Sequence, residues 1–216
     1  MIKAVIFNMT GVICDPTLFL HQARVDYLKK LGVDYTLEEA RKKLGLSMKD
    51  QLKIINKKYK LNLEYKEFSK ETAKIENESM KGKLKANPGV KELIKELKDN
   101  KIKIAIASQN IKSNIDFYLE EIELRDFDAI TTVEELTKFK PDPQIFEITC
   151  KKLRVKPEEC VMIDDSVFGF EPAKKLGIKT IGFASKFQDK KKLEKVADLV
   201  VDSLDELSVN KIEAIN

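Results

Sequence analysis

Six short runs of apolar, β-favouring residues are spread along the chain and alternate with longer segments of helical period. The runs lie at residues 3–7, 103–108, 128–132, 160–165, 179–183 and 198–202. In the intervening segments, such as 90–97 and 146–153, apolar residues recur at the spacing of one helix face. Runs that are apolar throughout are typical of strands buried on both faces, and their alternation with helices is typical of βαβ units. The sequence therefore predicts an α/β fold with a Rossmann-like parallel sheet covered by helices.

Residues 16–85 interrupt this alternation, because they contain helical segments and charge runs but no comparable apolar run. Thr36 and Ser47 are suitable N-caps for the second and third of the expected helices. Four helices are expected, at 18–32, 36–45, 47–59 and 65–80. We therefore expect a small helical cap domain at 16–85, inserted into a core domain formed by residues 1–15 and 86–216.

Length and composition narrow the class of protein. The 216 residues suit one domain with a smaller insertion, and a hydrophobic content of 43% is enough for a buried core. No run approaches the ~18 apolar residues of a membrane span, and no signal-peptide pattern is present. These features predict a cytoplasmic protein with no membrane partner.

The charge balance and the cysteines argue against several kinds of partner. The net charge of +4 is mild, and basic residues are not interleaved with aromatic ones, so no nucleic-acid partner is expected. Cys14, Cys150 and Cys160 show neither close pairing nor metal-ligand spacing along the sequence, and we interpret them as reduced, buried thiols. No oligomeric state is predicted.

Polar residues follow the apolar runs, where ligands of open parallel sheets bind. The segments are Asn8-Met9-Thr10-Gly11-Val12, Ser108-Gln109-Asn110, Lys140-Pro141-Asp142-Pro143 and Asp164-Asp165-Ser166. A hydroxyl and an ammonium group can hold a phosphate, and two carboxylates can hold Mg²⁺. Taken singly, each segment is weak evidence, because a Ser at a strand end is usually a helix cap, Lys-Pro a loop charge and Asp-Asp-Ser a turn.

The order of these segments resembles the haloacid dehalogenase superfamily of phosphohydrolases, specifically its beta-phosphoglucomutase-like branch with a helical cap. That pattern has a first strand ending in Asp-x-Asp-Gly-Val, a Ser or Thr after the second strand, a Lys in a Lys-Pro-x-Pro-like loop, and an acidic pair before Ser-x-x-Gly. Here the places are filled by VIFNMTGVICD, IAIASQN, KFKPDPQIF and VMIDDSVFG. The resemblance covers nearly the whole chain and implies Mg²⁺-dependent phosphoryl transfer on a small phosphorylated metabolite.

The resemblance also assigns roles to individual positions. It implies catalytic positions at Asn8, Thr10, Ser108 and Lys140. It implies phosphate contacts from Gly11, Ser108, Gln109 and Lys140. It implies metal ligation at Asn8, the Thr10 backbone carbonyl, Asp164 and Asp165.

The chain departs from the family pattern at the two positions that carry out the family's reaction. The family's first Asp attacks phosphorus and the second acts as acid and base, but here the two positions are Asn8 and Thr10. An amide is a very poor nucleophile, and a hydroxyl does not exchange protons near neutral pH as a carboxyl does. We therefore expect a chain that is catalytically impaired or inactive as written, with weakened Mg²⁺ binding. An engineered replacement and a natural loss of turnover both explain the two residues.

Three residues of the expected cap are candidates for substrate contacts. His21 lies close to where the resembled mutases place a histidine, and Arg24 is one helical turn further on. Lys49 lies in GLSMKDQL, which resembles the cap's Gly-x-Ser segment. A helix-packing histidine and a solvated lysine remain the alternative explanations.

Two further departures follow the acidic pair. Phe168 replaces a small residue and is expected to narrow the pocket or pack against the cap, whereas Gly169 keeps the usual glycine. Pro172 is tolerable only within the first turn of the next helix, which predicts a shifted helix start.

Two functions are consistent with these residues. The first is a phosphatase or phosphomutase scaffold whose nucleophile is missing. The second is a non-catalytic binding or regulatory module that retains the phosphate pocket.

Overall fold

The computed structural model describes residues 1–43, 48–185 and 189–215 and divides into two compact units. The first unit comprises Met1–Asp15 and the chain from Lys85 onward, and the second comprises Pro16–Leu84. Each unit has its own hydrophobic core. The chain crosses between them twice, so the second unit is an insertion in the first.

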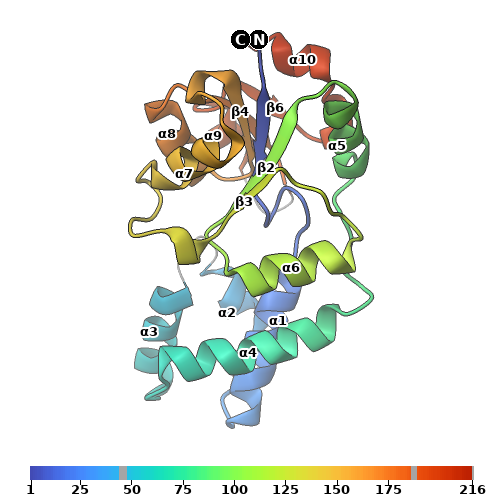
Figure 1. The fold of residues 1–216 in the computed structure, drawn as a ribbon. Helices are drawn as coiled ribbons and strands as arrows, with labels where there is room; N and C mark the ends of the chain where they lie inside the picture. Colours follow the sequence, from blue (N-terminus) through green and yellow to red (C-terminus); the bar gives the residue numbers. More distant parts are fainter. Residues whose placement is uncertain (44–47, 186–188, 216) are drawn as a thin grey trace. The chain divides into compact units, whose positions relative to one another are not determined.

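The first unit is built on a six-stranded sheet in which every pair of neighbouring strands is parallel (Figure 1). The strands are β1 (Ala4–Phe7), β2 (Lys103–Ala107), β3 (Ala129–Thr131), β4 (Cys160–Asp164), β5 (Lys179–Phe183) and β6 (Leu199–Val201). Their order is β3-β2-β1-β4-β5-β6, so the chain first moves to one side of β1 and then to the other. The expected Rossmann-like parallel sheet is therefore confirmed.

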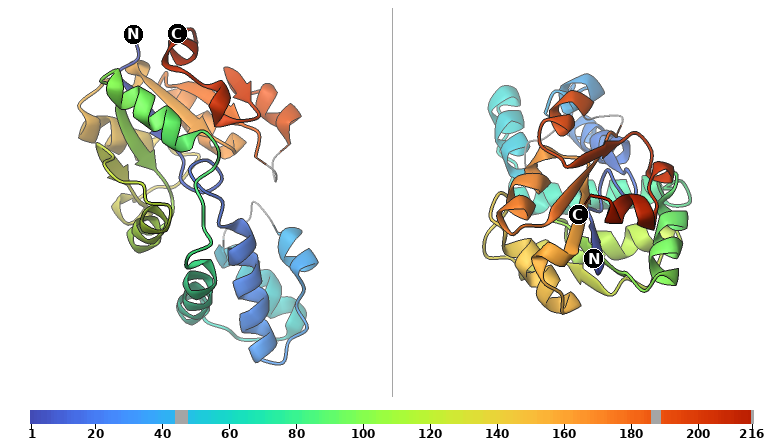
Figure 2. Two further views of the ribbon diagram at one scale, coloured as in Figure 1. Left: turned by 90° about the vertical axis from the view of Figure 1, so that its right-hand side faces the viewer. Right: turned by 90° about the horizontal axis from the view of Figure 1, so that it is seen from above.

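Helices separate the strands of this unit and follow the last strand. They are α5 (Val90–Asp99), α6 (Lys112–Glu121), α7 (Gln144–Leu153), α8 (Val167–Lys175), α9 (Lys190–Glu194) and α10 (Val209–Glu213). Short 3-10 helices lie at η1 (Val133–Glu135), η2 (Pro157–Glu159) and η3 (Leu204–Glu206). Crossover connections between parallel strands are right-handed. The helices that connect strands in one direction across the sheet therefore cover one face, and the helices that connect strands in the other direction cover the opposite face (Figure 2).

The core of the first unit explains why its strands are apolar throughout. Ala4 and Ile6 pack on one face of the sheet with Phe146 of α7 and Ala173 of α8. The intervening β1 residue Val5 is also fully buried, and successive strand residues point to opposite faces. Both faces of the central strand are thus covered.

The described residues of the second unit form four helices. They are α1 (Thr17–Lys30), α2 (Leu37–Arg41), α3 (Met48–Tyr59) and α4 (Tyr65–Met80). The rings of Tyr27 and Phe68 pack edge to face, with centroids 5.7 Å apart, and join α1 to α4. The helix expected at 36–45 ends at Arg41, and Ser47, the expected cap of α3, lies outside the described residues.

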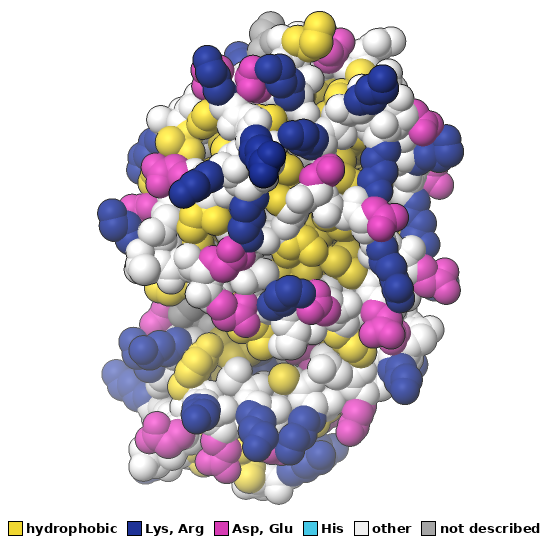
Figure 3. All heavy atoms as spheres, viewed as in Figure 1, with side chains coloured by type: hydrophobic (Ala, Val, Ile, Leu, Met, Phe, Trp, Pro, Cys, Tyr) yellow, Lys and Arg dark blue, Asp and Glu magenta, His cyan; other side chains and the backbone are white. Residues whose placement is uncertain are grey.

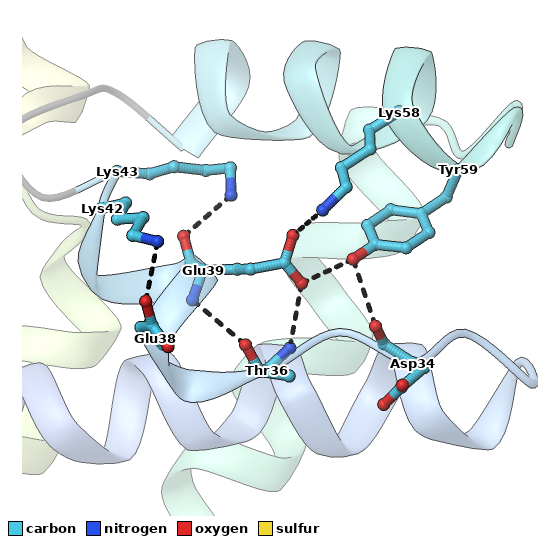
Figure 4. A network of polar contacts seen from close by, with 8 residues as sticks. All are labelled: Asp34, Thr36, Glu38, Glu39, Lys42, Lys43, Lys58 and Tyr59. Atoms are coloured by element: carbon cyan, nitrogen blue, oxygen red, sulfur yellow. Dashed lines mark hydrogen bonds and ion pairs between the residues drawn. The ribbon is translucent and has the colours of Figure 1, made fainter.

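A polar network fixes the start of α2 (Figure 4). The Thr36 hydroxyl accepts a hydrogen bond from the Glu39 backbone N–H, and the Glu39 carboxylate accepts one from the Thr36 N–H. This is a capping box, as the Thr36 prediction requires. The Glu39 carboxylate also accepts hydrogen bonds from Lys58 and from the Tyr59 hydroxyl, so it ties α2 to α3.

Pro172 is a correction to the sequence-based expectation. It lies inside α8, beyond the first turn of a helix that begins at Val167. The Ser166 hydroxyl accepts a hydrogen bond from the Phe168 N–H and fixes that start. The cap therefore determines where the helix begins, and α8 continues through a residue that has no N–H to donate.

Charged side chains of both signs are mixed on the molecular surface. On the face shown in Figure 3, Lys and Arg side chains alternate with Asp and Glu. Many form ion pairs one helical turn apart, such as Lys95 with Asp99 and Lys112 with Asp116. No helix within the described ranges is long and apolar enough to cross a membrane.

Candidate active site

The carboxyl ends of β1, β2 and β4 surround a cavity of about 330 Å³ that lies entirely within the first unit. Its lining residues are Asn8, Thr10, Ser108, Gln109, Asn110, Lys140, Asp164, Ser166, Phe168 and Gly169. The strand register brings them together, because Phe7 is level with both Ile106 and Ile163 and the polar residues follow directly. The volume is in the range of small-molecule sites.

The side chain of Asn8 is turned toward its own loop. Its backbone N–H donates to the Ile163 carbonyl at 2.9 Å, which continues the β1–β4 ladder by one residue. Its side-chain Nδ2 donates to the Thr10 carbonyl oxygen at 2.8 Å. The backbone carbonyl expected to face a metal ion therefore accepts an N–H of the amide that replaces the family's nucleophile.

A buried ion pair crosses the pocket from the 138–143 loop to β4. Lys140 Nζ lies 3.1 Å from Asp164 Oδ2, and only 9% and 1% of the two side chains are exposed. Asp164 Oδ1 also accepts the Ser166 backbone N–H at 3.0 Å. The ammonium is 5.5 Å from the centroid of the Phe146 ring. Of the residues that line the cavity, Asp164 is the only carboxylate, and it is already neutralised by Lys140.

The loop after β2 provides a hydroxyl group. Ser108 is buried, and its Oγ accepts the Asn110 backbone N–H at 3.2 Å, which leaves the hydroxyl proton to be donated. Gln109 is exposed at the cavity. The pocket therefore combines an ammonium, a hydroxyl and amide groups, all of which can donate to phosphate oxygens.

Asp165 and Gly11 were predicted for the site but do not line the cavity. The Ser185 hydroxyl donates to Asp165 Oδ2 at 2.9 Å. Burial, and next the negative charge of Asp164, raise the pKa of Asp165 to about 7, against the hydrogen bond from Ser185, which lowers it. Gly11 has a φ of +90°, and a Cβ there would collide with the Asp165 carboxylate. The two residues therefore pack against each other outside the lining of the cavity.

The donor set does not fit a divalent cation in this arrangement. Mg²⁺ requires several oxygen ligands in octahedral geometry. The Thr10 carbonyl accepts the Asn8 amide, Asp164 pairs with Lys140, and Asp165 accepts from Ser185. No group of three or more His, Cys, Asp or Glu side chains that could hold a metal ion occurs among the residues described.

The candidate residues of the expected cap lie in the second unit. His21 and Arg24 are buried on α1, and Arg24 Nη1 donates to Gln51 Oε1 of α3 at 2.8 Å. Lys49 is exposed in the first turn of α3. Arg24 thus joins two helices of its own unit, and substrate contacts by these three residues remain a prediction.

Several residues of the cavity had no role assigned from the sequence. Asn110, Ser166 and Gly169 line the cavity. Phe168, which was expected to narrow the pocket or pack against the cap, also lines it and is 61% exposed. Asn110 and Ser166 belong to the strand-end segments that were singled out, so their position along the chain is the available signal. Ser185 follows β5, a strand end whose polar residues were not considered.

Comparison with known proteins supports the resemblance. The sequence profile of the haloacid dehalogenase-like hydrolase family matches residues 5–183. The phosphorylated carbohydrates phosphatase of Thermotoga maritima is 29% identical over 83% of each chain. Hexitol phosphatase B of Escherichia coli is 27% identical over 98% of this chain and 96% of its own.

A solved structure agrees with the sequence comparisons. The beta-phosphoglucomutase of Clostridium difficile has a TM-score of 0.81 and 27% identity, covering 100% of this chain and 97% of the other. The profile match covers most of the sequence and includes the strand ends that form the cavity. The chain therefore belongs to the haloacid dehalogenase-like hydrolase family.

Proposed function

We propose that the pocket of the first unit binds a small phosphorylated metabolite of the sugar-phosphate class, on a phosphatase or phosphomutase scaffold that does not turn over as written. The observation that carries the proposal is the position of Asn8. Its amide lies at the end of β1, in the same cavity as Ser108 and Lys140, where the family has its nucleophile.

The binding part of the proposal rests on the donors that line the cavity. Lys140 can donate from its ammonium group, because Asp164 accepts only one of its three N–H bonds. Ser108 can donate its hydroxyl proton to a phosphate oxygen. The names of the relatives, which include phosphatases of phosphorylated carbohydrates and hexitols, support a sugar-phosphate class of ligand.

The loss of turnover follows from the chemistry of positions 8 and 10. The lone pair of the Asn8 amide nitrogen is delocalised, and its N–H donates to the Thr10 carbonyl instead of presenting an anionic oxygen to phosphorus. The Thr10 hydroxyl has no titration near neutral pH with which to protonate a leaving alkoxide. A phospho-aspartate mechanism needs a nucleophilic carboxylate and an acid–base carboxyl group, and positions 8 and 10 provide neither.

Restoration of the two carboxylates tests this proposal. We expect Asn8→Asp together with Thr10→Asp to produce phosphatase activity that requires added Mg²⁺, whereas the chain as written stays inactive. The measurement is phosphate release from a panel of sugar phosphates, phosphoglycolate and an aryl phosphate.

The same assay separates the two candidate functions. Activity of the double variant alone supports an enzyme scaffold silenced at two positions. Inactivity of both forms, together with calorimetric binding of a panel member, supports a binding or regulatory module. Turnover by the chain as written contradicts the proposed role of Asn8.

A further inference from the structure

We infer that this pocket binds phosphate and phosphate monoesters without a divalent cation, because the Asn8 amide and the Lys140 ammonium replace the cation's contacts. The inference rests on the proposed function and goes one step further, since it assigns the counter-charge of the bound phosphate to the protein itself. Three observations within the first unit carry it.

The first observation is the charge of the residues around the pocket. The family pattern places two carboxylates after the first strand and an acidic pair after the fourth, next to one lysine. This chain keeps Asp164, Asp165 and Lys140 but has neutral residues at positions 8 and 10. The missing charge of two carboxylates equals the charge of one divalent cation. The pocket without a cation therefore has the net charge that the family's pocket has with one.

The second observation is the contact between Asn8 and Thr10. An N–H group repels a cation, and Asn8 Nδ2 lies 2.8 Å from the Thr10 carbonyl oxygen, on the oxygen that would have to coordinate the metal. A cation bound to the second lone pair of this carbonyl would lie close to the N–H group of Asn8, which disfavours its binding. The second N–H of the same amide gives the pocket a donor for an anion, which an aspartate does not provide.

The third observation is that the remaining carboxylates already have partners. Asp164 is 1% exposed and lies 3.1 Å from the Lys140 ammonium, so its charge is compensated at close range in a buried site. Asp165 accepts the Ser185 hydroxyl and does not line the cavity. A cation would have to compete with an ammonium for one carboxylate and with a hydroxyl for the other.

Calorimetry with inorganic phosphate tests the inference on the intact chain. We expect the dissociation constant of phosphate to differ by less than about twofold between buffer with EDTA and buffer with Mg²⁺. For Asn8→Asp, which adds a negative charge beside the bound anion, we expect binding at least about tenfold weaker in EDTA than in Mg²⁺. Asn210→Asp is the matched control, because it makes the same change at an exposed residue of α10 outside the cavity.

The outcomes distinguish this inference from the proposed function. Binding of phosphate only in the presence of Mg²⁺ leaves the proposed function standing and overturns the inference. Absence of binding in both buffers overturns the proposed function and the inference with it. An Asn210→Asp variant that acquires the same Mg²⁺ requirement as Asn8→Asp also overturns it, because the effect is then one of total charge.

A second measurement needs no variant. Titration of the chain as written with Mn²⁺, followed by the electron paramagnetic resonance signal of the free ion, reports cation binding directly. We expect no binding in the micromolar range in the absence of phosphate. Micromolar Mn²⁺ binding that is competed by Mg²⁺ contradicts the inference, whether or not phosphate binds.

Discussion

At Gly11 a single hydrogen atom in place of a side chain allows the first loop to form. Its φ of +90° lies in the left-handed region, and the Asp165 carboxylate occupies the space a Cβ would need. Gly177 has a similar φ of +79° but open space around it. Substitutions at the two glycines therefore distinguish the energetic cost of backbone strain alone from the added cost of a steric collision.

We expect Gly177→Ala to reduce the free energy of unfolding by about 1 kcal/mol, the cost of a left-handed alanine. We expect Gly11→Ala to reduce it by about 2 kcal/mol more, because the buried Asp165 must also move. Urea unfolding followed by circular dichroism measures both. Equal losses in the two variants would show that the contact with Asp165 is unimportant for stability.

Most of the pocket could be predicted because polar residues at the ends of adjacent parallel strands meet at one edge of the sheet. This rule places Asn8, Ser108 and Asp164 correctly in the cavity. It does not separate Asp164 from Asp165, although successive side chains at a strand end point to opposite sides. Chain position alone does not show that Ser185 lies beside Asp165, because that contact depends on how the loop after β5 turns back.

At the scale of elements, the network around Glu39 joins α2 to α3 in the second unit. Its hydrogen bonds from Lys58 and then from Tyr59 hold the pKa of Glu39 well below the usual glutamate range, at about 2. The ionised form is therefore favoured by folding. The resulting stabilisation is fully present above the unfolded pKa of about 4.3 and is lost as the pH falls toward 2.

We expect the stability of the second unit to fall more steeply between pH 5 and pH 3 in the chain as written than in Glu39→Gln. The difference should be no more than about 1 kcal/mol, because the Lys58 side chain is 54% exposed and water screens the pair. Tyrosine fluorescence during urea unfolding is a suitable probe. The chain has no Trp, and Tyr118 is the only one of its 5 Tyr residues outside the second unit.

Glu78→Gln provides the comparison for this measurement. Glu78 is exposed on α4 and lies outside the Glu39 network. It should keep the pH dependence of the chain as written. If Glu39→Gln keeps it as well, the network does not contribute to the stability of the unit.

The strands were easier to predict than the helix ends. All six apolar runs became strands, because burial on both faces leaves a continuous apolar signal in the sequence. The end of α2 at Arg41 and the passage of α8 through Pro172 depend on tertiary packing and on a side-chain cap. Local propensity does not contain that information.

At the scale of the whole molecule, the reactivity of the three cysteine thiols indicates whether the first unit is folded. Cys14, Cys150 and Cys160 are all buried and free. The sulfur atoms of Cys150 and Cys160 lie 3.8 Å apart, a proximity that their spacing along the sequence does not show. Ten residues separate the two along the chain, and the return from α7 into β4 brings them together.

We expect the folded protein to react with a disulfide reagent such as DTNB far more slowly than the unfolded protein, in which all three thiols are accessible. Burial, and next the charge of Asp15, raise the pKa of Cys14 to about 12. At pH 8 only about one in ten thousand Cys14 side chains is then in the reactive thiolate form. Rapid reaction of one thiol in the folded protein would show that this part of the unit opens readily.

The two crossings between the units lie next to each other in the first unit. Cys14 forms an antiparallel bridge with Ala86, and the Asn87 N–H donates to the Ile13 carbonyl at 2.9 Å. The Asn87 side chain also donates to the carbonyls of Gly11 and Val12, each at 2.8 Å. Paired antiparallel segments are close enough for a two-residue turn to join them. A shortened chain in which a two-residue turn replaces residues 16–84 would therefore keep the sheet of the first unit and its pocket. The same junction would also accept a different inserted domain.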